Sequence, residues 1–172
     1  MTAIILDTET TDLGGFMIEL AWKNINSHEI FEQRYNPKCR ISKGASAVHQ
    51  IFDKDVFDKP CHTTVSIPSD VRFIIGHNIN FDLRVLRRSG IDTSRFKAIC
   101  TLKLARKAFP NFKSYSLSQL MFALFDLDVA ERLTANAHQA MADIQMTELL
   151  LEQIVKKLDI PMNAELIYAV QE

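Results

Sequence analysis

Residues 4–11 constrain this chain more than any other stretch, because an apolar, β-branched run ends there in two acids. Residues 3–6 are apolar at every position, which predicts a strand buried on both of its faces. Side chains of a strand repeat every two residues, so we expect Asp7 and Glu9 to point to the same face. Two such carboxylates repel each other unless a cation lies between them. The pair alone is equally consistent with a strand that ends in a polar loop.

The length and the charge of the chain narrow the class of protein. A chain of 172 residues predicts one domain, residues 1–172, with room for a proper core. The formal net charge of −1 excludes a globally basic protein. Lys and Arg nevertheless outnumber Asp and Glu between residues 82 and 113. A local basic sector suits a phosphate backbone, although solvated helix faces would give the same composition.

The cysteines and the apolar runs indicate where the protein resides. Cys39, Cys61 and Cys100 are odd in number and form no C-x-x-C pair, which favours free thiols in a reducing compartment. The N-terminus shows no signal-peptide pattern, and no apolar run approaches the length of a membrane span. We therefore predict a cytoplasmic location and no membrane partner.

Hydrophobic periodicity predicts an α/β fold. Three early strands joined by short links favour an antiparallel meander, followed by strand, helix, strand and further helices. Residues 38–68 are expected to be loop, with one short helix near 53–57. The strands are predicted at 3–6, 16–23, 29–35, 71–76 and 96–100, and the longer helices near 80–89, 101–109, 116–125 and 136–158.

Asp82 follows a helix-start signal. Asn78 or Asn80 is expected to cap the helix that carries Asp82 in its first turn, where the helix dipole favours an anion. Asp82 alone would therefore be interpreted as a helix-stabilising acid. His77, just before it, would be a structural histidine that bonds a neighbouring loop.

The longest predicted helix carries the remaining candidates. Asn136, with Gln139 three residues later, resembles a capping box and would place His138 in the first turn. The positive end of the helix dipole would then keep His138 neutral and available as a base. Asp143 adjoins the apolar stripe at Ile144, a costly position unless the acid is paired or bound to metal. An exposed Asp on the flank of the helix is the alternative.

Together, three motifs resemble the DnaQ-like (DEDDh) 3′→5′ exonuclease family. They are Asp7-Thr8-Glu9, His77 to Asp82 (H-N-x-x-F-D) and His138 to Asp143 (H-x-A-x-x-D), in the family's order. The resemblance implies a ribonuclease-H-like α/β fold, with a five-stranded mixed sheet of order 3-2-1-4-5 flanked by helices. Residues 99–106 are most similar to the exodeoxyribonuclease X branch of that family.

The chain departs from the family pattern at a few positions. Asp12 replaces a usual Gly, a change that we expect to be tolerated because Asp also adopts the left-handed conformation. Gln50 stands in a motif that often reads H-G-I. Gln139 occupies the position of the tyrosine in the tyrosine-bearing branch, which disfavours that branch. None of these changes removes an acid.

The resemblance implies metal-dependent hydrolysis of phosphodiester bonds at DNA 3′ ends. Two Mg²⁺ or Mn²⁺ ions would be held by the catalytic acids Asp7, Glu9, Asp82 and Asp143, and His138 would act as the base. The products would be nucleoside 5′-monophosphates, and DNA repair or end processing would be the setting. The partner would be the 3′ end of single-stranded DNA, with duplex DNA and RNA left open. The oligomeric state also stays open, a homodimer included.

The resemblance also implies a set of substrate contacts, for which structural alternatives remain. Leu13 and Phe81 could instead belong to the core, and His49 could be a structural loop histidine. The expected substrate-binding residues are Thr8, Thr10, Leu13, His49, Asn78 and Phe81.

Two other functions compete with DNA hydrolysis. One is RNA 3′-end trimming of the ribonuclease T or oligoribonuclease type, because sugar choice depends on contacts to the 2′-OH that this sequence does not reveal. The other is a non-catalytic nucleic-acid-binding module on the same fold. Inactive relatives would be expected to lack an acid or the histidine, whereas this chain has all five.

Overall fold

A mixed sheet of five strands forms the centre of the computed structural model, which describes residues 2–171. Its order is β3-β2-β1-β4-β5, as predicted. The antiparallel neighbours are β1–β2 and β2–β3, and the parallel neighbours are β1–β4 and β4–β5. The strands are β1 (Thr2–Thr10), β2 (Met17–Asn24), β3 (Ile30–Arg34), β4 (Val71–Gly76) and β5 (Lys97–Cys100).

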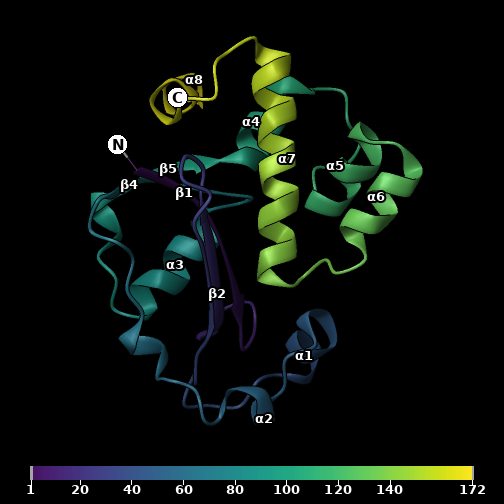
Figure 1. Ribbon diagram of the computed structural model, residues 1–172. Helices are drawn as coiled ribbons and strands as arrows, with labels where there is room; N and C mark the ends of the chain where they lie inside the picture. Colours follow the sequence, from purple (N-terminus) through teal and green to yellow (C-terminus); the bar gives the residue numbers. More distant parts are fainter. Residues whose placement is uncertain (1, 172) are drawn as a thin grey trace.

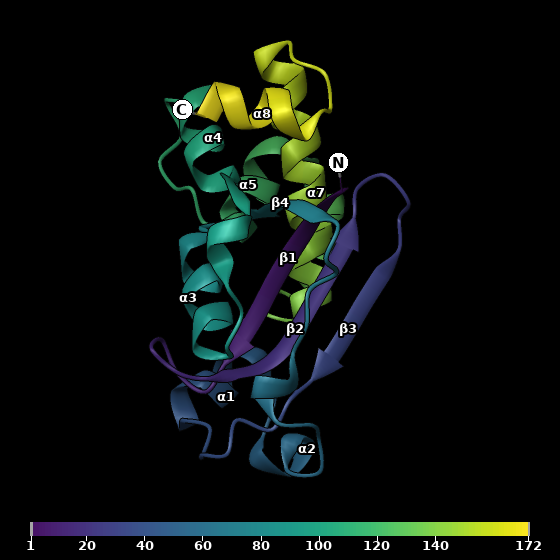
Figure 2. The same cartoon turned by 90° about the vertical axis from the view of Figure 1, so that its left-hand side faces the viewer.

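Eight helices surround the sheet within the described residues. In Figures 1 and 2, α3 lies on one side of the sheet and α7 on the other, while α1 and α2 lie together at one end. The helices are α1 (Lys43–His49), α2 (Asp53–Val56), α3 (Asn80–Arg88), α4 (Thr101–Ala108), α5 (Leu117–Leu124), α6 (Leu127–Thr134), α7 (Ala140–Leu158) and α8 (Ala164–Gln171). Two short 3₁₀ helices cover His62–Thr64 and Thr93–Arg95. None of the helices in this part of the chain combines the length and the apolar character of a membrane span.

The side chains on the two faces of β1 pack into two separate hydrophobic cores. Ile5 packs with α4, α5 and α7 residues on one face, whereas Ile4 and Leu6 pack with α3 residues on the other. Because side chains alternate, Asp7 and Glu9 continue the face of Ile5, and Thr8 continues the face of Leu6. The sheet therefore aims the two acids toward α7 and the threonine toward α3.

Several predicted boundaries were wrong, because backbone conformation at helix starts depends on tertiary contacts. The longest helix begins at Ala140 and not at Asn136, since His138 has the left-handed φ of 67° and interrupts the helix. Neither Asn78 nor Asn80 caps α3: the N-cap is Ile79, and Asn78 also has a positive φ of 62°. Asp12 needs no left-handed backbone, and its carboxylate instead accepts a hydrogen bond from the Gly14 N–H at 2.8 Å.

Three helices were not predicted. The segment expected to be loop contains α1 as well as the predicted helix at α2, and α6 and α8 were missed. The start of α1 has a local signal, since the Ser42 hydroxyl accepts a hydrogen bond from the Ala45 N–H at 3.1 Å. Its end is local as well: Gln50 takes the left-handed φ of 59°, and the Ser46 hydroxyl donates to the Ile51 carbonyl at 2.8 Å. Short helices held in this way give weak periodicity in sequence.

Candidate active site

Three acids converge where β1 ends beside α7. Each of Asp7, Glu9 and Asp143 offers a carboxylate oxygen, and these oxygens lie within 4.8 Å of one another. Asp7 and Glu9 share a face of β1, as predicted, and Asp143 lies in the first turn of α7. The β1–β2 register shifts between Glu9 and Thr10, and such bulges often adjust the aim of side chains at sites. Residues more than 130 positions apart therefore form one cluster.

Asp82 approaches the same cluster from the other face of the sheet. Its side chain is only 3% exposed, and its Oδ1 accepts a hydrogen bond from the Thr8 hydroxyl at 2.8 Å. After burial, its charge is the largest contributor to the raised pKa of Asp7. All four predicted acids thus meet at the end of β1, with Thr8 holding the orientation of Asp82.

Burial and mutual repulsion raise the pKa values of these acids. Burial, followed by repulsion from Asp143, Glu19 and Asp82, raises the pKa of Glu9 to about 8. Burial also raises the pKa of Asp82 to about 7, against the opposing hydrogen bond from Thr8. The pKa of Asp7 is raised well above its usual value, chiefly by burial and then by Asp82. The pKa of Asp143 is raised mainly by burial.

This cluster has the donor chemistry of a divalent-cation site. Carboxylate oxygens are the ligands that Mg²⁺, Mn²⁺ and Ca²⁺ prefer, and no thiolate belongs to the group. Acids held at this spacing share an unfavourable interaction that a bound cation would relieve. The residues present therefore fit the metal that the motifs imply.

His138 lies next to the cluster, though not in the helical position predicted for it. It is exposed and precedes the first residue of α7 by two positions. Its backbone N–H donates to the Asp143 Oδ1 at 3.1 Å, and its ring is close enough to lower the pKa of Asp143. His138 therefore lies beside the acids, as predicted, and its ring is exposed to solvent.

A cavity of about 600 Å³ adjoins the acids and shares Glu9 with them. Its apolar wall comes from Leu13, Val48 and Phe81, and Leu13 is 93% exposed. The core alternative is therefore wrong for Leu13, whereas Phe81 also packs partly against the core on the α3 side. The remaining lining residues are Thr10, Asp12, Gly14, Ser42, Gly44, Ala45 and His49.

The other expected substrate residues have different surroundings. Thr8 is buried and bonded to Asp82, and Asn78 is exposed on the loop before α3. Neither is among the residues lining this cavity. His49 lines it, but Nδ1 accepts from the Ile51 N–H at 3.1 Å and Nε2 donates to the Thr10 carbonyl at 3.2 Å. Both ring nitrogens thus have partners, and the contact of Nε2 joins α1 to β1.

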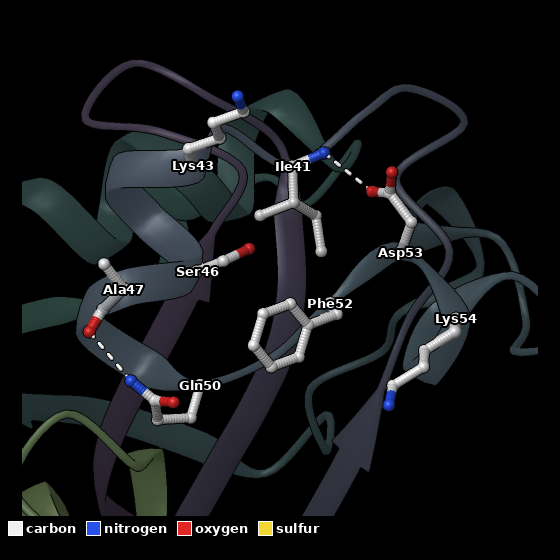
Figure 3. Close-up of a pocket in the computed structure, with 8 residues that line it drawn as sticks. All are labelled: Ile41, Lys43, Ser46, Ala47, Gln50, Phe52, Asp53 and Lys54. Carbon is white, nitrogen blue, oxygen red and sulfur yellow. Dashed lines mark hydrogen bonds between the residues drawn. The ribbon is translucent and has the colours of Figure 1, made fainter.

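A second hollow of about 520 Å³ also borders α1, through residues that do not line the first cavity (Figure 3). Lys43, Phe52 and Lys54 line it, and Asp53 is the acid that it contains. Oδ1 of Asp53 accepts a hydrogen bond from the Ile41 N–H at 2.9 Å. This hollow holds none of the four clustered acids, so the chemistry of the site belongs to the cavity beside Glu9.

His77 has the structural role considered from the sequence. Nε2 donates to the Tyr115 carbonyl at 2.8 Å, so Nδ1 is the acceptor for the Thr101 hydroxyl at 3.0 Å. Burial lowers the pKa of His77, which favours this neutral form. The loop that leads to Asp82 is thereby fixed to the α4–α5 segment.

Sequence reasoning missed Glu19, which lies directly opposite Glu9 in the sheet and is 3% exposed. The available signal was a lone acid between Ile18 and Leu20, in the middle of a buried strand. A charge in such a position needs a partner, and that requirement could have marked it.

Comparison with known proteins agrees with this geometry. A family model described as "Exonuclease" matches residues 4–151. Exodeoxyribonuclease 10 of Escherichia coli (strain K12) is 31% identical over 156 residues, which cover 88% of this chain and 67% of that protein. DNA polymerase III PolC-type of Bacillus subtilis (strain 168) is 28% identical over 172 residues, which cover 90% of this chain but 11% of that protein.

Solved structures give the same result. The structure described as exonuclease X in complex with 5′ overhanging duplex DNA has a TM-score of 0.76 and 27% identity to this chain, and the match covers 99% of each. Both the family and the sheet order predicted from the sequence are thus confirmed. The chain belongs to the exonuclease family and has the ribonuclease H-like fold of its structural neighbours.

Proposed function

We propose that this protein is a metal-dependent 3′→5′ exonuclease that removes nucleoside 5′-monophosphates from DNA 3′ ends. The observation that carries this proposal is the shared position of Glu9, which belongs both to the acidic cluster and to the wall of the 600 Å³ cavity. A nucleotide seated in that cavity would present its phosphate to the acids. The proposal includes a role in DNA repair or end processing, and a cytoplasmic location stays a prediction.

The four acids are proposed to hold two Mg²⁺ or Mn²⁺ ions. Asp7, Glu9 and Asp143 offer oxygens to a common point, and Asp82 lies beside Asp7. Divalent cations bound there would lower the pKa of a water molecule and stabilise the departing 3′ oxygen. The Thr8 hydroxyl, by bonding one Asp82 oxygen, leaves the other free for this purpose.

His138 is proposed to take the proton from the attacking water. Its ring is exposed next to Asp143, so an imidazole nitrogen is available there to accept a proton and pass it to solvent. The main-chain bond to Asp143 holds the residue that carries this ring.

The cavity wall is proposed to seat the terminal nucleotide. Leu13, Val48 and Phe81 offer apolar surface to a base, and an exposed Leu13 has no such contact in the protein itself. Arg88 donates to the Gly15 carbonyl at 3.2 Å, and the Arg84 guanidinium lies 5.9 Å from the centre of the Phe81 ring. Both arginines line a smaller hollow that shares Leu13, Gly14 and Phe81 with the cavity, and a phosphate backbone would pass there.

DNA is preferred over RNA as the proposed substrate because of the relatives. Exodeoxyribonuclease 10 is named for that substrate, and the matched exonuclease X structure contains DNA. The test is digestion of 5′-labelled DNA and RNA oligonucleotides of equal sequence, with Mg²⁺, Mn²⁺ or EDTA. We expect a ladder shortened from the 3′ end of DNA with either cation, nucleoside 5′-monophosphate as product and no digestion in EDTA.

A matched pair of variants shows whether the digestion comes from this site or from a contaminating nuclease. Asp143→Asn removes one clustered carboxylate, and Asp128→Asn makes the same chemical change at an exposed position of α6. Only Asp143→Asn should abolish digestion. Binding of a 3′ end without release of nucleotide by the wild-type protein would instead support the non-catalytic alternative, and faster digestion of RNA would support the trimming alternative.

A further inference from the structure

Glu19 is a buried charge with an unusual position in the sheet. The β-ladders place it directly opposite Glu9 on one side and directly opposite Arg34 on the other. Like charges that face each other across strands are destabilising, and Glu19 contributes to the raised pKa of both Asp7 and Glu9. A carboxylate that costs free energy here needs a compensating contact.

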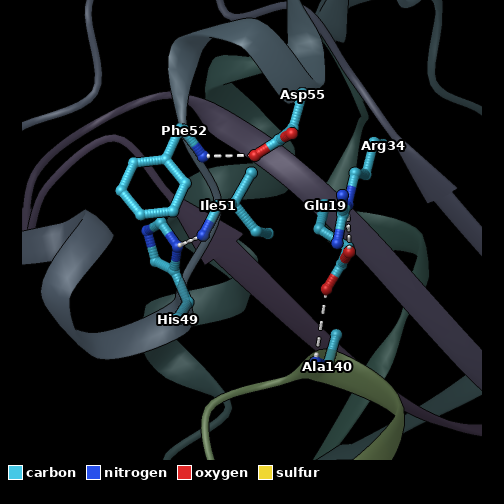
Figure 4. A network of polar contacts seen from close by, with 7 residues as sticks. All are labelled: Glu19, Arg34, His49, Ile51, Phe52, Asp55 and Ala140. Atoms are coloured by element: carbon cyan, nitrogen blue, oxygen red, sulfur yellow. Dashed lines mark hydrogen bonds and ion pairs between the residues drawn. The ribbon is translucent and has the colours of Figure 1, made fainter.

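Both oxygens of Glu19 have partners on different elements (Figure 4). Oε1 accepts from Arg34 Nε at 2.9 Å, an ion pair between neighbouring strands. Oε2 accepts from the Ala140 N–H at 3.4 Å, across the sheet–helix interface. Since both oxygens are engaged, and the carboxylate group that converges within 4.8 Å consists of Asp7, Glu9 and Asp143, Glu19 is placed to hold structure and not to ligate.

The contact with Ala140 serves a helix start that lacks its own cap. Gln139 is the N-cap residue of α7, and its side chain makes no capping hydrogen bond. The first N–H groups of a helix need acceptors, and a carboxylate is favoured at this positive end. Glu19, which precedes Ala140 by 121 residues, supplies that acceptor from the sheet.

The start of α7 carries the parts of the site that β1 does not. Asp143 is in the first turn, and the N–H of His138, just before the helix, bonds Asp143. A displacement of this turn would move both residues relative to Asp7 and Glu9. Small displacements of reacting groups have large effects on rate.

We propose that Glu19, held by Arg34, is a positioning residue that fixes the start of α7 and so places Asp143 and His138 against the acids of β1. The inference rests on the proposed nuclease function for its catalytic consequence. Its structural consequence, a helix start tied to the sheet, can be measured without catalysis or metal.

The experiment compares Glu19→Ala, Glu19→Gln and Arg34→Met with the wild-type protein. Glu32→Ala serves as the matched control, because Glu32 is an exposed acid on the neighbouring strand β3. The first readout is amide hydrogen exchange by NMR in EDTA. In Glu19→Ala, the Ala140 and Asp143 amides should exchange about tenfold faster, while the Leu150 and Ile154 amides keep their wild-type protection.

The second readout is Mn²⁺ affinity by calorimetry together with steady-state hydrolysis of a DNA oligonucleotide. Loss of residues that orient metal ligands typically costs about 10–100-fold in affinity or activity, and we expect a loss of that size for Glu19→Ala. The loss should fall on kcat more than on KM, because Glu19 does not line the cavity. Glu19→Gln keeps an acceptor for Ala140 and should recover most of the exchange protection and of kcat.

The pairing with Arg34 gives a further check. Arg34→Met should also accelerate exchange of the Ala140 and Asp143 amides. The double variant, Glu19→Ala with Arg34→Met, should exchange no faster than Glu19→Ala alone, because both changes disrupt the same contact between Glu19 and Ala140. Wild-type exchange and kcat in Glu19→Ala would overturn the proposal, and so would additive effects in the double variant.

Three more outcomes are distinguishable. Equal acceleration at Leu150 and Ile154 would show general destabilisation and overturn the proposal. Glu19→Gln with wild-type exchange but the Mn²⁺ affinity of Glu19→Ala would make Glu19 a ligand, which also overturns it. A wild-type protein that releases no nucleotide would remove the proposed function, while accelerated exchange at Ala140 in Glu19→Ala would still support the structural tie.

Discussion

Replacing Glu9 by Gln should stabilise the metal-free protein while it destroys the site. The pKa of Glu9 rises from 4.5 to about 8 on folding, so between these values the unfolded chain carries a charge that the folded chain must neutralise by taking up a proton. The favourable contribution of this protonated carboxyl is complete below pH 4.5 and is lost as the pH rises through about 8. Gln pays no such cost.

The expected gain in the free energy of unfolding follows from the shift in the pKa of Glu9. Each pH unit above the unfolded pKa costs about 1.4 kcal/mol, which gives roughly 3 kcal/mol at pH 7 for a fully shielded group. Glu9 is partly exposed, so solvent screening should reduce the measured gain to about 1.5 kcal/mol. The gain should approach zero near pH 4.5, the usual pKa of the side chain.

Urea unfolding in EDTA at pH 5 and pH 8 measures this gain. The single Trp of the chain, Trp22, is 5% exposed and provides a fluorescence signal for unfolding. Glu152→Gln, at an exposed position of α7, is the control and should change stability by less than about 0.5 kcal/mol. Addition of Mg²⁺ should reverse the order, since ligand binding stabilises the wild type more than a variant that lacks one ligand.

A Glu9→Gln variant that is no more stable than the wild type at pH 8 in EDTA would contradict this prediction. A gain in stability at pH 5 equal to the gain at pH 8 would contradict it as well. Either result would mean that repulsion and burial do not strain the folded, metal-free site.

Other measurements probe the remaining parts of the site. Asp143→Asn should abolish nucleotide release and weaken Mn²⁺ binding in calorimetry; unchanged affinity would remove Asp143 from the ligand set. His138→Ala should lower kcat by about 10²–10⁴-fold with metal affinity largely kept, as expected for a base, and equal loss of metal in both variants would contradict that role. Affinity for Mg²⁺ should rise from pH 6 to pH 8.5 with release of protons, because Glu9 and Asp82, with pKa values of about 8 and about 7, must ionise to bind the cation. Calorimetry in buffers of different ionisation enthalpy measures the number of protons released. A pH-independent affinity would contradict the raised pKa values. Leu13→Ala should raise KM for an oligonucleotide by up to about tenfold, because a Leu side chain that the bound substrate buries contributes about 1.5 kcal/mol or more. The free energy of unfolding in urea should change by less than about 0.5 kcal/mol, since Leu13 is 93% exposed in the protein alone. An unchanged KM would show that Leu13 does not contact the substrate.

The amino-acid sequence alone predicted the central strand and the direction of its acids. A run of apolar residues at 3–6 can only be buried, and the two-residue repeat of a strand then puts Asp7 and Glu9 on one face. These properties depend on near neighbours in the chain, so they can be inferred without knowing the rest. The motif spacing added the family and, with it, the identity of Asp82, Asp143 and His138.

The pKa values and the hydrogen-bond partners of these residues depend on the tertiary structure. The raised pKa values of the acids come from burial and from charges on other elements, and Nε2 of His49 is occupied by the Thr10 carbonyl, which only the folded chain brings to it. The hydrogen bond from the Ala140 N–H to Glu19 likewise joins the start of α7 to β2, across 121 residues of the chain. Electrostatic surroundings and helix ends are set by what packs nearby in space, and that information is spread over the whole chain and not contained in any local pattern.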